Sequence, residues 1–190
     1  MAEQPQVADS VSPEQFFEQL LPTGFVAQTQ AGGAAPQDFT MQYRLTGEGG
    51  GDWAVAIREG RMTAARGGGE ANITFTLGVE DWRDCVLGRN GATLAVIIPQ
   101  GRAGRPDNSG RAKQLRGTLA LELAREAGDP LRVEMCFNNA AIPRTVMKIK
   151  LADWAAMQEG RLNGQEAFMT GKMKIEGDLA FLMQLAALTA

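Results

Sequence analysis

Residues 172–188 read KMKIEGDLAFLMQLAAL and combine two different periodicities. Met173 and Ile175 alternate with lysines, which is the pattern of a β-strand with one buried face. Asp178 then precedes a run in which Gln184 is the only polar residue, so we predict that a helix begins at this aspartate. A helix that is apolar nearly all round must be deeply buried, line a cavity or face a partner.

Period-two alternation also occurs at earlier positions of the chain. Its apolar members are Met41, Tyr43 and Leu45; Trp53, Val55 and Ile57; Ile73, Phe75 and Leu77; Leu119, Leu121 and Leu123; Leu131, Val133, Met135 and Phe137; Met147, Ile149 and Leu151. Together with the strand at Met173 and Ile175, these segments predict an α+β protein. We expect a largely antiparallel sheet of about six to seven strands, with one face buried and the other exposed to solvent.

Helices and turns are expected between these strands. Helical patterns at 80–88, 152–160 and 178–188 are predicted to cover the buried face of the sheet. The glycine clusters at 47–51 and 67–69 are predicted to be hairpin connections.

The two middle helices belong to an internal strand–helix pseudo-repeat. Asp81-Trp82 is followed six residues later by Gly88-Arg89, and Asp153-Trp154 is followed at the same spacing by Gly160-Arg161. The two copies are about 72 residues apart, which is long enough for a whole sheet-and-helix unit. We expect each aspartate to cap its helix and each glycine to end it.

The regions outside the pattern set the domain organisation. Ser12, Pro13 and Gln15 predict a helix start, and Pro22 is expected to end that helix. A Gly/Ala/Pro-rich linker at 30–38 then separates an N-terminal arm and helix, 1–38, from a single domain at 39–190. Within that domain, residues 99–113 are predicted to form a flexible basic loop.

The composition excludes several kinds of active site. The chain has 190 residues, 44% of them hydrophobic, and a net charge of −3, which argues against general attraction to nucleic acid. Histidine is absent, so His-based triads, His general bases and His-containing zinc sites are excluded. We therefore expect no enzyme, no metal and no cofactor.

The cysteines and the N-terminus indicate a compartment. Cys85 and Cys136 are expected to be unpaired thiols, and Met1 to Ser10 has no basic start or apolar run that would mark a secretory leader. No stretch reaches the length that spans a bilayer. The sequence is typical of a cytoplasmic protein.

The C-terminal stretch resembles a known family. Gly160-Arg161, Ala167-Phe168, Gly171-Lys172, the strand at Met173–Ile175, Gly177-Asp178 and the apolar helix are similar, in this order, to the end of sterol carrier protein type-2 domains. The hairpin at Leu45-Thr46-Gly47 and the strand from Ile73 to Leu77 also resemble the first half of that family. The stretch 91–145 is longer than the usual connection, so it is expected to reshape or fill the cavity.

The resemblance implies a hydrophobic tunnel between the sheet and its helices. The residues expected to form the tunnel wall are Phe75, Trp82, Ile149, Leu151, Trp154, Phe168, Met173, Ile175, Leu182, Met183 and Leu185. Alternation alone already places most of them on the buried face of the sheet, so ordinary core packing is the competing interpretation. The C-terminus, Leu188-Thr189-Ala190, is not the peroxisomal address of some eukaryotic members, which favours a bacterial member.

The function implied by the resemblance is binding of a lipid or fatty-acyl-like molecule, and transfer of this molecule between membranes stays open. The alternative is a non-catalytic scaffold or accessory subunit of an enzyme complex that handles lipophilic intermediates. The partner is then a small lipophilic molecule and not nucleic acid. A transient contact with a membrane surface and a homodimer stay open at this point.

Overall fold

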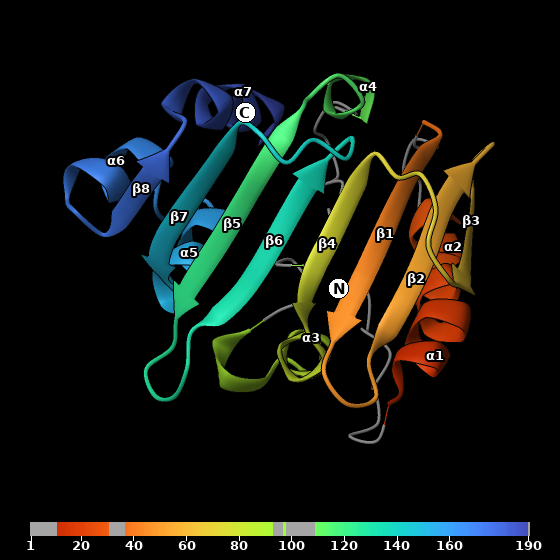
Figure 1. Cartoon of the computed structure of the whole chain (residues 1–190). Helices are drawn as coiled ribbons and strands as arrows, with labels where there is room; N and C mark the ends of the chain where they lie inside the picture. The colour runs from red at the N-terminus through yellow and green to blue at the C-terminus, as the bar shows by residue number, and fades with distance from the viewer. Residues whose placement is uncertain (1–10, 31–36, 93–96, 98–108, 190) are drawn as a thin grey trace.

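The computed structural model describes residues 11–30, 37–92, 97 and 109–189, and these residues form one sheet with helices (Figure 1). The strands are β1 (Phe39–Thr46), β2 (Gly51–Arg58), β3 (Arg61–Arg66), β4 (Ile73–Gly78), β5 (Gly117–Ala124), β6 (Leu131–Phe137), β7 (Arg144–Lys150) and β8 (Met173–Gly177). The α-helices are α1 (Pro13–Gln15), α2 (Leu21–Gln30), α3 (Val79–Leu87), α4 (Ser109–Ala112), α5 (Leu151–Gln158), α6 (Gly164–Met169) and α7 (Leu179–Thr189). A π-helical turn, η1 (Phe16–Leu20), joins α1 to α2, and a 3-10 turn, η2 (Arg89–Gly91), follows α3.

The sheet has eight strands in the order β3-β2-β1-β4-β6-β5-β7-β8. The α+β class and the alternation of faces are confirmed, but the sheet is mixed. β1 pairs with β4 and β5 pairs with β7 in parallel, while the other neighbours are antiparallel. The eighth strand, β3, was not predicted, because its residues are mostly exposed and include few large apolar side chains.

The expected pseudo-repeat extends to the topology. In the first unit, the hairpin of β1 and β2 is followed by β4, which pairs in parallel with the free side of β1, and then by α3. In the second unit, the hairpin of β5 and β6 is followed by β7, which pairs in parallel with the free side of β5, and then by α5. The two units stand side by side in one sheet, as β2-β1-β4 and β6-β5-β7.

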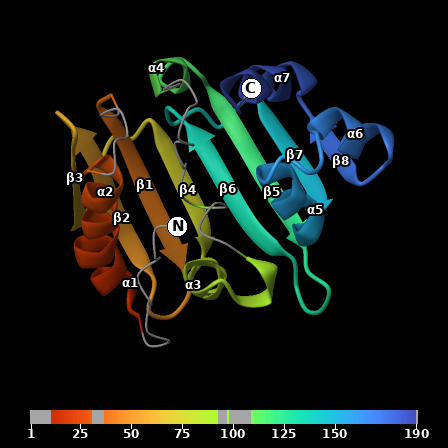
Figure 2. The same cartoon turned by 180° about the vertical axis from the view of Figure 1, so that it is seen from behind.

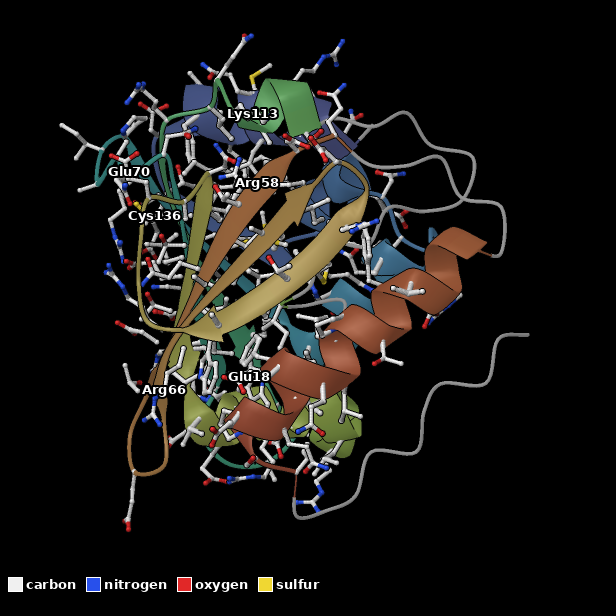
Figure 3. All side chains as sticks on the ribbon, turned by 90° about the vertical axis from the view of Figure 1, so that its right-hand side faces the viewer. Glu18, Arg58, Arg66, Glu70, Lys113 and Cys136 are labelled. Atoms are coloured by element: carbon white, nitrogen blue, oxygen red, sulfur yellow. The ribbon has the colours of Figure 1, made fainter. Side chains whose placement is uncertain are left out.

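One face of the sheet is covered and the other is open. Figure 2 shows the covered face, with η1 and α2 over the strands of the first unit and α5 over those of the second. Figure 3 looks at the β3 edge, with the N-terminal helix on one side of the sheet and the labelled Cys136 on the other. Tyr43, Trp53, Phe75, Leu121 and Ile149 point to the covered side and are buried.

The N-terminal helix differs from the prediction at Pro22. Ser12 caps the helix as expected, since its Oγ accepts a hydrogen bond from the Gln15 N–H at 3.1 Å. Pro22 does not end the helix, because the π-helical turn η1 precedes it and places it in the first turn of α2, where a missing N–H is tolerated. Phe16 and Phe17 are buried in the same core as the sheet.

The helix caps are partly as expected. Gly88 and Gly160 have positive φ and follow the ends of α3 and α5, which confirms their role. Asp81 and Asp153 are not caps, because α3 and α5 begin three residues earlier than a cap at those positions would require. Each aspartate instead binds a cation: Asp81 pairs with Arg125, and Asp153 pairs with Lys172 at 2.8 Å.

The glycine clusters differ in what they connect, and most of the predicted loop and linker lies outside the described residues. Gly47–Gly51 lies in the β1–β2 hairpin as predicted, but 67–69 does not join a hairpin, because β1 and β2 lie between β3 and β4 in the sheet. The predicted loop at 99–113 lies outside the described residues except for 109–113, where α4 begins. Most of the linker at 30–38 and the arm at 1–10 also lie outside them.

Candidate ligand-binding site

The covered face of the first unit is built on an aromatic cluster. Phe17 from η1 lies 4.8 Å from the ring of Tyr43 and 5.5 Å from that of Trp53, measured between ring centroids. Tyr43 stacks on Phe75 at 5.1 Å, and Phe16 meets Trp82 edge-on at 5.5 Å. The predicted site residues Phe75 and Trp82 are thus buried among aromatic rings at the β1–β4 side of the core.

The second unit contributes the aliphatic part of the covered face. Ile149 ends β7, Leu151 begins α5 and Met173 begins β8, and all three are buried in the same core. Half-buried side chains that pack against this core complete the set: Trp154, Ile175, Leu182 and Leu185. Most of the predicted wall residues therefore lie on one continuous apolar surface under the helices.

Phe168 and Met183 differ from the rest of the predicted set. Phe168 in α6 is 52% exposed, and Met183 in α7 is 69% exposed. Neither packs against the core, so a ligand would touch them only if it reached the outer sides of α6 and α7. Their direction could not be read from the sequence, because the residues around them are also apolar.

Ile97 is a part of the covered face that the sequence did not indicate. Its side chain is 0% exposed, and its carbonyl oxygen accepts a hydrogen bond from the Tyr43 hydroxyl at 3.1 Å. Burial raises the pKa of Tyr43 well above its usual value, so this hydroxyl stays a donor. The segment of Ile97 is rich in small and apolar residues without a clear period, which left no signal for this contact.

Three buried indole N–H groups have no partner in the part of the chain that the structure describes. They belong to Trp53, Trp82 and Trp154, and no described hydrogen-bond acceptor reaches them. Buried donors in folded proteins are nearly always satisfied, by protein, by water or by a ligand. A bound molecule with an oxygen acceptor beside Trp82 or Trp154 would remove the free-energy cost of burying an indole N–H without a hydrogen bond.

Two hollows of the described residues lie on the open face of the sheet. One, of about 390 Å³, is bordered by Glu122, Lys148, Lys150, Lys172 and Lys174. Glu176 accepts a hydrogen bond from Lys148 at 2.8 Å and raises the pKa of that amine. The other, of about 200 Å³, lies over β1 and β2. Both hollows are lined mainly by the polar and small residues of the open face.

The described side chains offer few groups for other chemistry. Within these ranges no three Cys, Asp or Glu side chains come together to hold a metal ion. Cys85 is buried, and burial, with Asp81 and Asp84 nearby, raises the pKa of its thiol to about 12, which keeps it protonated and unreactive. No helix among the described residues is long and apolar enough to cross a membrane.

Comparison with known proteins finds a family model that matches the C-terminal part of the chain. Residues 99–190 match the model of the SCP-2 sterol transfer family, which confirms the predicted resemblance over this stretch. The match includes the whole second unit, from β5 to α7, whereas the first unit lies outside it. No curated protein matches the sequence.

Among solved structures, the comparison finds a match to a double mutant of the sec-alkyl sulfatase PisA1. It is 14% identical, with a TM-score of 0.32, and the alignment covers 95% of this chain but only 16% of the sulfatase chain. This chain therefore spans about a sixth of that protein's length, and at this TM-score the likeness supports no argument.

Proposed function

Because residues 99–190 match the model of the SCP-2 sterol transfer family, we propose that the protein binds a lipid or another lipophilic molecule on the covered face of its sheet. The ligand lies between the strands and the helices α3, α5 and α7. The family match is the observation that carries this proposal.

The arrangement of side chains agrees with such a ligand. Leu151 and Trp154 come from α5, Leu182 and Leu185 come from α7, and all four lie in or pack against the same apolar core. The ligand's chain contacts these residues, and its polar end accepts a hydrogen bond from the indole of Trp154 or Trp82, which otherwise has no acceptor. Phe168 and Met183 are left out of this wall because they are exposed.

The proposed activity is binding without catalysis. The chain has no histidine to act as a general base, and the thiol of Cys85 is buried and protonated. Both cysteines are free, which agrees with a reducing compartment such as the cytoplasm. Transfer of the ligand between membranes is the role proposed for this binding.

A scaffold role is the second candidate, and Ile97 favours it. This residue is fully buried on the covered face and is held by the hydroxyl of Tyr43. If its segment fills the space under the helices permanently, the apolar surface is only a core. The protein would then serve as a non-catalytic subunit of a complex.

Ligand titration separates the two candidates. After delipidation with solvent, the full chain is titrated with a fluorescent fatty-acyl probe while the emission of its tryptophans is followed. We expect saturable binding at micromolar concentration, displacement by an unlabelled fatty acid and a change in tryptophan emission. The change in emission should largely disappear in Trp154→Phe, because Trp154 is half-buried and packs against the core at the proposed wall, whereas Trp53 and Trp82 are fully enclosed.

A pair of leucine variants provides the matched control. Leu182→Gln, in α7, should weaken binding of the probe by about tenfold, because a polar amide replaces part of the proposed wall. Leu21→Gln replaces an equally half-buried leucine of the N-terminal helix and should lower stability without changing the affinity. A probe that does not saturate, with unchanged tryptophan emission, would favour the scaffold.

A further inference from the structure

α7 exposes an apolar face that nothing in the described residues covers. The helix from Leu179 to Thr189 contains no charged residue. Leu179 is 54% exposed and Met183 is 69% exposed, and a spacing of four residues places both on one side of the helix. The opposite side carries Phe181, which is 1% exposed and packs against the core.

A further apolar side chain lies at the same end of the sheet. Ile142 precedes Pro143 in the connection from β6 to β7 and is 79% exposed. Pro143 and Phe181 both closely approach Gly117, so this connection and α7 meet there. Ile142, Leu179 and Met183 are thus three exposed apolar side chains, here called the apolar group, at the end of the molecule where β5 and β7 begin.

Positive charges border this apolar group. Residues 109–116, which include α4, contain Arg111, Lys113 and Arg116, all exposed, and no acidic residue. Arg111 Nη1 donates a hydrogen bond to the Ala187 carbonyl oxygen at 3.5 Å, which joins the segment to α7. Figures 1 and 2 both show α4 and α7 next to each other at this end of the sheet.

We propose that this end of the molecule docks onto the surface of an anionic lipid bilayer. The docking face consists of Ile142, Leu179 and Met183, with Arg111, Lys113 and Arg116 at its border. The apolar side chains enter the region between the headgroups, while the cations lie beside lipid phosphates. Exposed apolar side chains beside Arg111, Lys113 and Arg116 fit such a surface better than they fit a second copy, which would bring its own cations against them. The exposed Asp178 next to Leu179 is the cap of α7, since its Oδ1 accepts a hydrogen bond from the Phe181 N–H.

The docking face extends the proposed function, since a lipid carrier exchanges its ligand where it meets a bilayer. Docking itself is measured without any ligand, so the test of docking does not depend on ligand binding. The full chain is sedimented with vesicles of phosphatidylcholine, with or without phosphatidylglycerol. We expect binding to the anionic vesicles, weaker binding to the neutral ones, and loss of binding at high salt.

Two variants test the two parts of the face. Leu179→Gln should lower the partition of the protein onto anionic vesicles by about tenfold, because an inserted leucine is lost. The double variant Lys113→Glu/Arg116→Glu should abolish the preference for anionic vesicles. Val26→Gln and Arg61→Glu change an exposed apolar residue and an exposed cation near the opposite edge of the sheet, and should bind as the wild type does.

Circular dichroism melting establishes that each variant is folded, and Leu179→Gln should take up the acyl probe normally. The docking face would be overturned if the wild type did not bind anionic vesicles. It would also be overturned if both test variants bound them as strongly as the wild type does. A concentration-dependent dimer that Leu179→Gln dissociates would overturn it too, since the face would then hold a second copy. Vesicle binding without probe uptake would instead retain the docking face and reject the proposed function.

Discussion

Gly117 is the first residue of β5 and lies against Phe181 of α7, so there is no room at this position for the methyl group of an alanine. A Cβ at this position would lie 2.6 Å from Phe181 Cε2 and 2.8 Å from the Pro143 carbonyl oxygen, and φ is +138°. Gly117→Ala should therefore lower the free energy of unfolding by about 2–4 kcal/mol, because Phe181 must move out of the core. Urea denaturation followed by circular dichroism measures this change.

Gly128 supplies the control for backbone strain alone. It also has positive φ, at +85°, but nothing lies within 4 Å of an added Cβ. Gly128→Ala should cost only about 1 kcal/mol. Equal costs for the two variants would mean that Phe181 does not pack closely on Gly117.

Cys85 makes the stability of the protein depend on alkaline pH. Its thiol has a pKa of about 12 in the fold, raised by burial and by Asp81 and Asp84, against an ordinary value of 9.0. Between these two values the unfolded chain loses the proton and the folded chain keeps it, so the free energy of unfolding falls as pH rises. Below pH 9.0 the contribution is fully present.

Cys85→Ala should flatten this pH dependence. Urea denaturation of the variant and the wild type across the alkaline range should show a smaller loss for the variant. Cys136→Ala is the matched control, since Cys136 is only half buried, and it should keep the wild-type slope. Identical slopes in all three proteins would contradict the burial of a neutral thiol at Cys85.

Among the elements, α3 is held to the second unit by one arginine. Arg125 Nη2 lies 2.8 Å from Asp81 Oδ1 and 2.9 Å from Asp84 Oδ2, and all three side chains are largely buried. Arg125→Ala removes the cation that lies between these two carboxylates, so it should lower the free energy of unfolding by roughly 3 kcal/mol. Thermal and urea denaturation measure the loss.

An exposed ion pair gives the comparison. Arg144 and Glu134 are 2.6 Å apart on the open face, and each side chain is more than 40% exposed. Arg144→Ala should cost less than about 1 kcal/mol, because water screens this pair. If the two arginine variants lose the same stability, the buried cluster does not hold α3 in place.

The elements that follow a regular period could be predicted from the sequence. Leu119, Leu121 and Leu123 alternate strictly and lie on the covered face of β5, and Asp178 begins α7 with its Oδ1 accepting from the Phe181 N–H at 2.7 Å. β3 was missed because an exposed edge strand buries too little to show a period. The parallel pairing of β1 with β4 was missed because alternation determines a strand's faces but not its neighbours.

At the scale of the whole molecule, the repeat organises both the sheet and the proposed site. The wall residues come from equivalent places in the two units: Trp82 from the start of α3, and Trp154 from the start of α5. The family's sequence pattern identified the second unit, but it did not indicate which apolar residues of α6 and α7 face outward. Phe168 and Met183 are exposed because packing of a uniformly apolar helix depends on tertiary contacts that periodicity does not encode.

Native mass spectrometry of the full chain, purified from its own host without detergent, tests the central proposal most directly. We expect the protein to carry an additional mass of a few hundred daltons, which organic extraction removes and a fatty acid or similar lipid restores in one-to-one ratio. The bound molecule should be present in Leu21→Gln and depleted in Leu182→Gln. A protein that always has the mass of its polypeptide alone, and that takes up no lipid after extraction, would contradict a ligand site on the covered face.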